Sequence, residues 1–422
     1  MSWHQNCTWW HVYPLGFCDA PLQNDDAHAP VPRLRHLLNW LDYVTELGVG
    51  GLLLGPIFSS QSHGYDSVDQ FQIDPRLGTM NDFDDLIRAC KDRGLHIVLD
   101  GVFNHLGNQH PWFQRAMNEG LHGEYASFFR INWDDPWQPR ADVFEGHGAL
   151  VALNHDNPAV AEYVSNVMKF WLGRGIDGWR LDAAYTVKAT FWSHVIPTVR
   201  AEFPESWFVG EVIHGDYTGI VARSGIDSVT QYELWKAIWS GLWDRNFFEL
   251  GWSLRRHNDF LNDFTPLTFI GNHDVTRIAS LVGPEHAVLA LTILLTVGGH
   301  PSIYYGDEQG FVGIKEHRFG GDDAIRPAFP KSPADLAPWG AWLFRVHQQL
   351  IALRNDRPWL TTAQTEQIVL TNEHLVYRTY STTSDDSITV ELDLRNSATA
   401  SIRDGYGQEL FEYVAASILA GD

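Results

Sequence analysis

The sequence predicts an α/β fold: a (β/α)₈ TIM barrel with a short excursion domain after the third strand and a small C-terminal antiparallel β domain. Short apolar runs alternate with longer segments of helical composition, which is typical of parallel β/α proteins rather than sandwiches. There are as many runs as strands in a closed barrel. The runs are Thr8–Tyr13, Gly51–Leu54, Ile97–Asp100, Gly178–Asp182, Trp207–Glu211, Ser228–Tyr232, Leu267–Asn272 and Ser302–Tyr305.

The segments between these runs supply the expected outer helices. The most clearly delimited is Met80–Arg93, because Asn81 and Asp82 are capping candidates at its start and Gly94 follows it as a C-cap. Other helix candidates are Arg33–Leu47, Pro158–Gly175 and Phe191–Phe203.

Two segments interrupt the alternation and set the expected domain boundaries. Residues 105–157 are irregular and rich in His, Trp, Asn, Pro and Gly, and a loop of this length inside a compact domain is usually functional. We expect them to form the excursion domain, and residues 1–104 and 158–357 to form the barrel. In residues 358–422, alternating Thr- and Val-rich segments predict a small β-sandwich.

Composition restricts the classes of partner. The formal net charge of −22 opposes binding to nucleic acid or an anionic membrane and leaves neutral or cationic ligands. The cysteines, Cys7, Cys18 and Cys90, are too few for a disulfide framework, so free thiols are expected. The longest apolar candidate, Ala287–Gly298, is too short to span a bilayer, and no signal peptide is visible. We therefore expect a cytoplasmic protein.

Four acidic residues follow predicted strands closely. Asp100, Asp182 and Glu211 close their runs, and Asp274 follows its run by two residues. The C-terminal ends of the strands carry the active site in (β/α)₈ barrels. One such carboxylate could simply cap the next helix. Four carboxylates on four strands would repel one another, so stability gives no reason for them and catalysis does.

The neighbours of two of these residues suggest different protonation states. Arg180 lies on the same face of its strand as Asp182, and this charge is expected to lower the pKa of Asp182 and keep it ionised. Glu211 precedes the apolar Val212 and Ile213, and an apolar surrounding is expected to raise its pKa. Such a pair suits glycoside hydrolysis, and a separation of about 5–5.5 Å would imply retention of configuration.

These residues stand in motifs that resemble the α-amylase superfamily of glycoside hydrolases and transglycosylases over essentially the whole chain. The matching segments are Gly64-Tyr65-Asp66, Asp74-Pro75-Arg76-Leu77-Gly78-Thr79, Asp100-Gly101-Val102-Phe103-Asn104-His105, Gly178-Trp179-Arg180-Leu181-Asp182-Ala183-Ala184, Gly210-Glu211-Val212, Phe269-Ile270-Gly271-Asn272-His273-Asp274 and Tyr304-Tyr305-Gly306-Asp307-Glu308. Within the superfamily, Gly178-Trp179-Arg180 and Glu211-Val212-Ile213-His214 look most like cyclomaltodextrinases and neopullulanases.

The resemblance implies a role for each residue. Asp182 would be the nucleophile, Glu211 the general acid/base, and Asp274 the residue that distorts the sugar ring. Arg180 and Asp100 would hold the nucleophile, His105 and His273 would hydrogen-bond the sugar, and Tyr65 would stack under it. The implied substrate-binding residues are Tyr65, Asp66, Asp100, His105, Arg180, His273 and Arg277.

The departures from the family pattern bear on cations and specificity. Tyr185-Thr186 stands where many calcium-dependent amylases carry Lys-His, so we expect neither a metal nor another cofactor. Ala152 replaces a more polar residue that often indicates specificity. The implied substrates are α-glucan oligosaccharides: linear or cyclic maltooligosaccharides, including cyclic maltosyl-maltose, cleaved at α-1,4 or α-1,6 bonds. Relatives of this size can form homodimers.

Three other functions deserve comparison. A transglycosylase or disaccharide isomerase, of the glucanotransferase or trehalose synthase type, shares every catalytic residue, and an aromatic wall from Trp112, Trp133 and Trp137 would favour it. A non-catalytic sugar-binding protein is disfavoured because the three catalytic carboxylates are all present. Metal-assisted chemistry is disfavoured because His105 and His273 are not spaced as a ligand motif.

Overall fold

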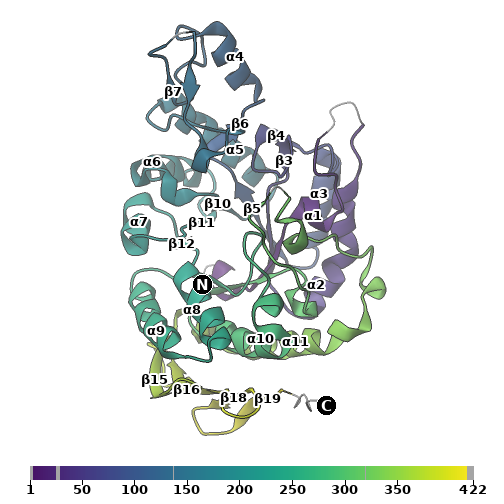
Figure 1. Ribbon diagram of the computed structural model, residues 1–422, viewed down its shortest axis with the longest axis vertical. Coiled ribbons are helices and arrows are strands. Elements are labelled where there is room, and N and C mark those ends of the chain that lie inside the picture. Colours follow the sequence, from purple (N-terminus) through teal and green to yellow (C-terminus); the bar gives the residue numbers. More distant parts are fainter. Residues whose placement is uncertain (1–2, 25–28, 136, 319, 416–422) are drawn as a thin grey trace.

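The computed structural model describes residues 3–24, 29–135, 137–318 and 320–415 and contains the expected barrel (Figure 1). Its eight strands are parallel and neighbour one another in chain order. A bridge between Thr230 and Leu267 joins the last pair of neighbours and closes the barrel. The barrel strands are β1 Trp9–Val12, β2 Gly51–Leu54, β5 His96–Gly101, β10 Gly178–Leu181, β11 Trp207–Gly210, β12 Ser228–Val229, β13 Leu267–Phe269 and β14 His300–Tyr304.

Helices cover the outside of the barrel. The expected helix Arg33–Leu47 is a 3₁₀ segment, η2 (Arg33–Trp40), followed by α2 (Leu41–Leu47). Thr79, and not Asn81 or Asp82, is the N-cap of α3, and the Asp82 side chain completes the capping box. The α-helices of the barrel are α1 Pro14–Phe17, α2 Leu41–Leu47, α3 Met80–Lys91, α5 Pro158–Gly173, α6 Ala189–Arg200, α7 Tyr217–Ser224, α8 Tyr232–Trp243, α9 Phe248–Leu261, α10 Ile278–Thr296 and α11 Ala341–Asn355.

Helix α10 is longer than the apolar stretch recognised in the sequence. It has 19 residues and a mean hydropathy of 1.8, so by length and composition alone it could cross a membrane. In the structure every residue from Ala287 to Thr296 is buried, and the helix contacts α8, α11 and the C-terminal sheet. These contacts make α10 a core helix of this fold.

The segment between β5 and α5 projects from the catalytic face of the barrel, at the top of Figure 1. Two small antiparallel pairs, β6·β9 and β7·β8, organise it. Trp112 stacks on Tyr125 at 4.9 Å and packs edge-on against Phe128. This domain therefore has its own aromatic core. Its elements are β6 His105–Gly107, α4 Pro111–Glu119, β7 Ile131–Asn132, β8 Arg140–Ala141, η3 Phe144–Gly146 and β9 Leu150–Ala152, and a further hairpin after β2 is formed by β3 Phe58–Ser60 and β4 Ser67–Ile73.

The C-terminal domain is a single sheet and not the expected sandwich. Its described residues form one five-stranded antiparallel sheet, and residues 416–422 lie outside the described part. The sheet contacts α9, α10 and α11, and the hydroxyls of Tyr377 and Thr296 lie 2.7 Å apart. Barrel helices thus cover the face that a second sheet would cover in a sandwich. The strands are β15 Gln364–Leu370, β16 His374–Tyr380, β17 Ser387–Asp393, β18 Thr399–Asp404 and β19 Glu409–Val414.

A buried ion pair holds the loops at one side of the catalytic face. Arg76 binds both carboxylate oxygens of Asp74, at 2.7 and 2.9 Å, and both side chains are almost fully buried. The same guanidinium donates to the backbone carbonyls of Leu22 (2.8 Å) and Ser62 (2.6 Å). One arginine therefore ties together two loops that meet beside the active-site cavity.

Replacing this arginine should be costly. Arg76→Met leaves the Asp74 charge buried without its partner, and we expect a loss of about 3–5 kcal/mol in the free energy of unfolding, measured by urea denaturation. The matched control is Arg88→Met, since Arg88 pairs with Asp85 at the surface and the loss there should be below about 1 kcal/mol. Equal losses in the two variants would show that the Arg76 pair does not hold the loops.

Candidate active site

A cavity of about 640 Å³ opens where the barrel strands end. Five of the predicted site residues line it: Tyr65, His105, Asp182, Glu211 and Asp274. They come from loops after different strands, so the barrel brings together residues far apart in the chain. Other lining residues from the barrel loops and the excursion domain are His63, Phe144, Glu145, His147, Leu150, Tyr185, Ile213, Tyr232, Lys315, Asp322 and Arg326.

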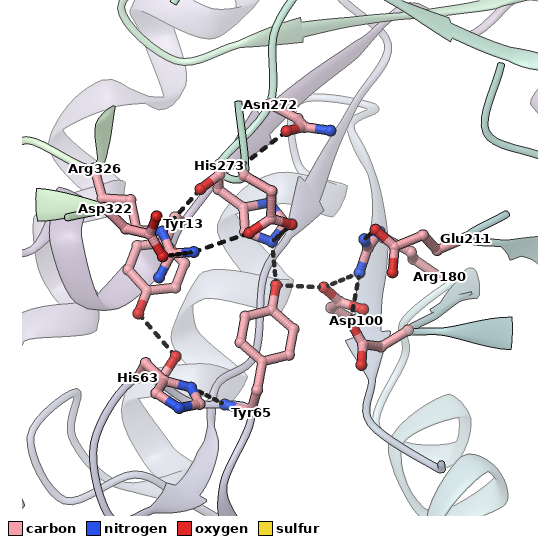
Figure 2. A network of polar contacts seen from close by, with 12 residues as sticks. Tyr13, His63, Tyr65, Asp100, Arg180, Glu211, Asn272, His273, Asp322 and Arg326 are labelled. Atoms are coloured by element: carbon pink, nitrogen blue, oxygen red, sulfur yellow. Dashed lines mark hydrogen bonds and ion pairs between the residues drawn. The ribbon is translucent and has the colours of Figure 1, made fainter. Parts of the chain in front are cut away.

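Arg180 lies behind the cavity wall at the centre of three carboxylates (Figure 2). Its guanidinium is 2.6 Å from Asp100 Oδ2, 2.6 Å from Glu211 Oε1 and 3.4 Å from Asp182 Oδ1. The two shorter contacts go to Asp100 and Glu211. The expected pairing with Asp182 is present, but it is the longest of the three.

The surroundings of Arg180 change the prediction for the pKa of Asp182. Burial, with the nearby charges of Glu211 and Asp100, raises the pKa of Asp182 well above its usual range, and Arg180 only partly opposes this. One guanidinium cannot balance three buried carboxylates, so Asp182 retains its proton to higher pH than a free carboxyl would. The expectation of a lowered Asp182 pKa was wrong, because burial and the charges of Glu211 and Asp100 outweigh the effect of Arg180.

The surroundings of Glu211 also differ from the expected apolar ones. Its carboxylate binds Arg180, accepts the backbone N–H of Ala183 at 3.0 Å, and accepts the Tyr232 hydroxyl at 3.3 Å. Val212 is buried in the hydrophobic core, and Ile213 lines the cavity. Glu211 therefore lies among polar groups on a wall that is apolar only in part.

A second network holds Asp274. One carboxylate oxygen lies 3.0 Å from His273 Nε2, and the other accepts Arg326 Nη2 at 2.9 Å. Burial alone would raise the pKa of Asp274, but the contacts with His273 and Arg326 outweigh it and hold that pKa well below its usual range. The hydroxyl of Tyr65 contacts His273 Nε2 and donates to Asp100 at 3.0 Å, which links this network to that of Arg180 (Figure 2).

His105 offers a neutral hydrogen-bonding group at the cavity. Burial lowers the pKa of His105 to about 3, so its ring is uncharged near neutral pH. Nδ1 lies 3.0 Å from the Asn104 amide, and Nε2 is buried. Phe144 stacks on the ring at 5.0 Å.

The other predicted site residues lie outside the cavity lining. Asp100, Arg180 and His273 are directly behind it, where they support Asp182, Glu211 and Asp274 as described. Asp66 is buried and accepts the Ser62 hydroxyl at 2.6 Å, so it shapes the Tyr65 loop.

Arg277 is not placed to bind substrate. It is fully buried, pairs with Asp307 at 2.9 Å and donates to the carbonyls of Tyr305 and Ile325. The family resemblance implied a substrate-binding role, but its side chain joins the loops after β13 and β14 instead.

The aromatic wall predicted from Trp112, Trp133 and Trp137 is absent from the described cavity lining. Trp112 belongs to the core of the excursion domain, and Trp137 is 92% exposed. Tyr185, the departure from the Lys-His pattern, does line the cavity and donates to Glu145 of the excursion domain at 2.9 Å. The apolar lining comes instead from smaller groups, including Phe144, Leu150 and Ile213.

Sequence reasoning missed Tyr232 and Arg326 as lining residues. Tyr232 ends the sixth apolar run, so its position at a strand end could have identified it. Arg326 lies in the irregular segment after β14, where no periodicity or strand boundary marks it.

The contact with Arg326 should be measurable on Asp274. Arg326→Gln removes a positive charge that lowers the Asp274 pKa, so we expect that pKa to rise in a carbon-13 NMR titration of labelled aspartate carboxyls, with Asp274→Asn giving the assignment. Arg200→Gln, which breaks a pair with Asp227 elsewhere, is the control and should leave the Asp274 signal unchanged. An unshifted Asp274 pKa in Arg326→Gln would contradict the described electrostatics.

Comparison with known proteins gives the family. Residues 11–337 match the model of the alpha amylase catalytic domain. The chain is 30% identical over 386 residues to a maltogenic alpha-amylase of Bacillus acidopullulyticus, which covers 85% of this chain and 64% of that protein. It is 28% identical over 433 residues to a cyclomaltodextrinase of Geobacillus thermopakistaniensis (94% of this chain, 70% of the relative).

A third relative is a transferase: a 4-alpha-glucanotransferase of Thermotoga neapolitana is 34% identical over 322 residues, covering 69% of this chain and 70% of that protein. The fold also matches the ligand-free cyclic alpha-maltosyl-(1→6)-maltose hydrolase of Arthrobacter globiformis. That match has a TM-score of 0.82 and 24% identity, over 99% of this chain and 100% of that one. With a catalytic-domain match over most of its length and the carboxylates grouped at the strand ends, the chain belongs to the alpha-amylase family.

Proposed function

We propose that this protein is a retaining glycoside hydrolase that cleaves α-glucosidic bonds in maltooligosaccharides, linear or cyclic, through a covalent glycosyl-enzyme intermediate. The observation that carries this proposal is the pair of carboxyls, Asp182 and Glu211, held by one guanidinium at the wall of a sugar-sized cavity. Retaining glycoside hydrolysis uses two carboxyl groups beside the glycosidic bond, one as nucleophile and one as general acid/base.

In the first step the Asp182 carboxylate attacks the anomeric carbon while Glu211 donates its proton to the leaving oxygen. In the second step the Glu211 carboxylate takes a proton from water, and this water displaces Asp182 from the sugar. The reaction begins with the proton on Glu211 and the charge on Asp182. Asp182, whose pKa is raised, must therefore lose its proton before it attacks, and the Arg180 guanidinium beside it stabilises the resulting charge.

The remaining polar groups of the cavity suit sugar hydroxyls. Asp274 stays ionised and accepts hydrogen bonds, while His105 contributes a neutral ring to the cavity lining. Tyr65 presents a ring at the cavity wall while its hydroxyl stays fixed to Asp100. A neutral ligand rich in hydroxyls matches these groups, and the net charge of −22 opposes an anionic one.

The paired carboxyls should show unequal losses on substitution. Asp182→Asn removes the nucleophile, and we expect kcat on a linear maltodextrin to fall by about 10⁴-fold or more. Glu211→Gln removes proton transfer and should cost about 10²–10⁴-fold. Asp216→Asn, at the exposed N-cap of α7, is the control. Its kcat should stay within about twofold of the wild-type value, because surface substitutions away from the site have small effects. Near-normal activity of Asp182→Asn, with a normal circular dichroism spectrum, would refute the assignment.

A transglycosylase is the second candidate, and the apolar part of the cavity wall at Phe144, Leu150 and Ile213 favours it, since an apolar acceptor site disfavours water. Chromatography of products from maltotriose, a longer linear maltodextrin, a cyclomaltodextrin and cyclic maltosyl-maltose separates the two. We expect only sugars shorter than the substrate, or ring opening followed by shortening. Products longer than the substrate would make the protein a glucanotransferase.

A further inference from the structure

A second groove opens beside the active-site cavity, on the hairpin of helices α8 and α9. It encloses about 330 Å³ and is lined by Trp235, Lys236, Glu249, Trp252 and Ser253 together with two residues of the main cavity. Those two residues are Ile213 and Tyr232, which line both spaces. The groove therefore adjoins the active-site cavity at these two residues.

The start of helix α8 places the groove next to the active-site cavity. Tyr232 is the first residue of the helix, and its hydroxyl donates to Glu211 at 3.3 Å. Trp235 follows within the same turn and packs on Tyr232 and Phe269. A helix that begins at the proposed acid/base thus leads directly into the groove.

The walls of the groove combine aromatic faces with hydrogen-bonding groups. Trp252 on α9 is 54% exposed, although a side chain of this size is usually buried. Its ring has the Arg256 guanidinium 5.9 Å from its centroid, and this contact helps to hold it in place. Flat aromatic rings pack well on the C–H face of a sugar, and the neighbouring polar side chains can serve its hydroxyls.

The charges of the groove are balanced within the protein. Lys236 binds both carboxylate oxygens of Glu249, at 2.6 and 2.7 Å, and the Ser240 hydroxyl donates to the same carboxylate. Glu233 pairs with Arg256 at 2.5 Å. Each cation has an anion beside it, so the groove offers hydrogen-bonding groups without a net charge. This chemistry favours a neutral polar ligand over a phosphate, a nucleotide or a charged peptide.

We propose that the groove binds glucose units of an α-glucan chain whose other units occupy the active-site cavity, so that Trp252 and Trp235 select for longer chains. The proposal rests on the proposed function, because it takes the main cavity to be an α-glucan site. It adds a binding site that sets the preferred length of the substrate chain, a property that the catalytic residues do not determine.

The test compares chain lengths in the Asp182→Asn variant, which keeps the substrate intact during calorimetric titration. We expect maltoheptaose to bind about tenfold more tightly than maltotriose, a difference of about 1.4 kcal/mol. Adding Trp252→Ala should remove this difference, and Trp252→Phe, which keeps a flat ring, should retain part of it. Trp243→Ala is the matched control, since Trp243 is 64% exposed on the same hairpin but outside the groove lining.

The outcomes separate the groove from the main site. Equal affinity for the two sugars, or equal losses in Trp252→Ala and Trp243→Ala, would overturn the groove while leaving the proposed function standing. Binding of neither sugar would overturn both. If sedimentation velocity shows a dimer that both tryptophan variants dissociate, the hairpin face is occupied by a second copy of the chain, and the groove proposal is also wrong.

Discussion

The site depends on one buried guanidinium that faces three carboxylates. Arg180 holds Asp100 and Glu211 at 2.6 Å and reaches Asp182 at 3.4 Å. Because one positive charge faces three acids, Arg180 only partly opposes the rise in the pKa of Asp182 that burial and the neighbouring carboxylates cause. The barrel makes this possible by placing Asp100 and Arg180 on the adjacent strands β5 and β10, and Glu211 directly after the next strand, β11. The arginine therefore both fixes the geometry and makes the acid and nucleophile roles available at one place.

Asp274 stands in a different electrostatic environment. It has two basic neighbours, His273 and Arg326, and the low pKa of its carboxyl follows from them despite burial. The site thus contains one carboxyl with a raised pKa, Asp182, and one with a lowered pKa, Asp274, within one cavity. Tyr65 connects the two halves through Asp100 and His273, so a change in one network is transmitted to the other by direct contact.

Most of the barrel and the grouping of Asp182, Glu211 and Asp274 at one cavity could be predicted, because both follow from local patterns: apolar runs make strands, and acidic residues follow them. What could not be predicted depends on contacts distant in sequence. The raised pKa of Asp182 depends on its burial and on the charges of Glu211 and Asp100, and the role of Arg277 depends on Asp307 in another loop. The C-terminal domain is a single sheet and not a sandwich, because α9, α10 and α11 cover one face of that sheet. Arg326 lies in a loop with no periodic signal, so only the folded chain reveals it.

The covalent intermediate on Asp182 is the central claim, and it can be observed directly. Glu211→Gln would be incubated with an α-maltosyl fluoride, whose fluoride leaves without protonation, so that the intermediate forms and its hydrolysis is slowed by loss of the base. The account predicts an intact mass increased by one maltosyl group, located on the Asp182 peptide after digestion. Turnover of the fluoride with no adduct, or an adduct on another carboxyl, would contradict it.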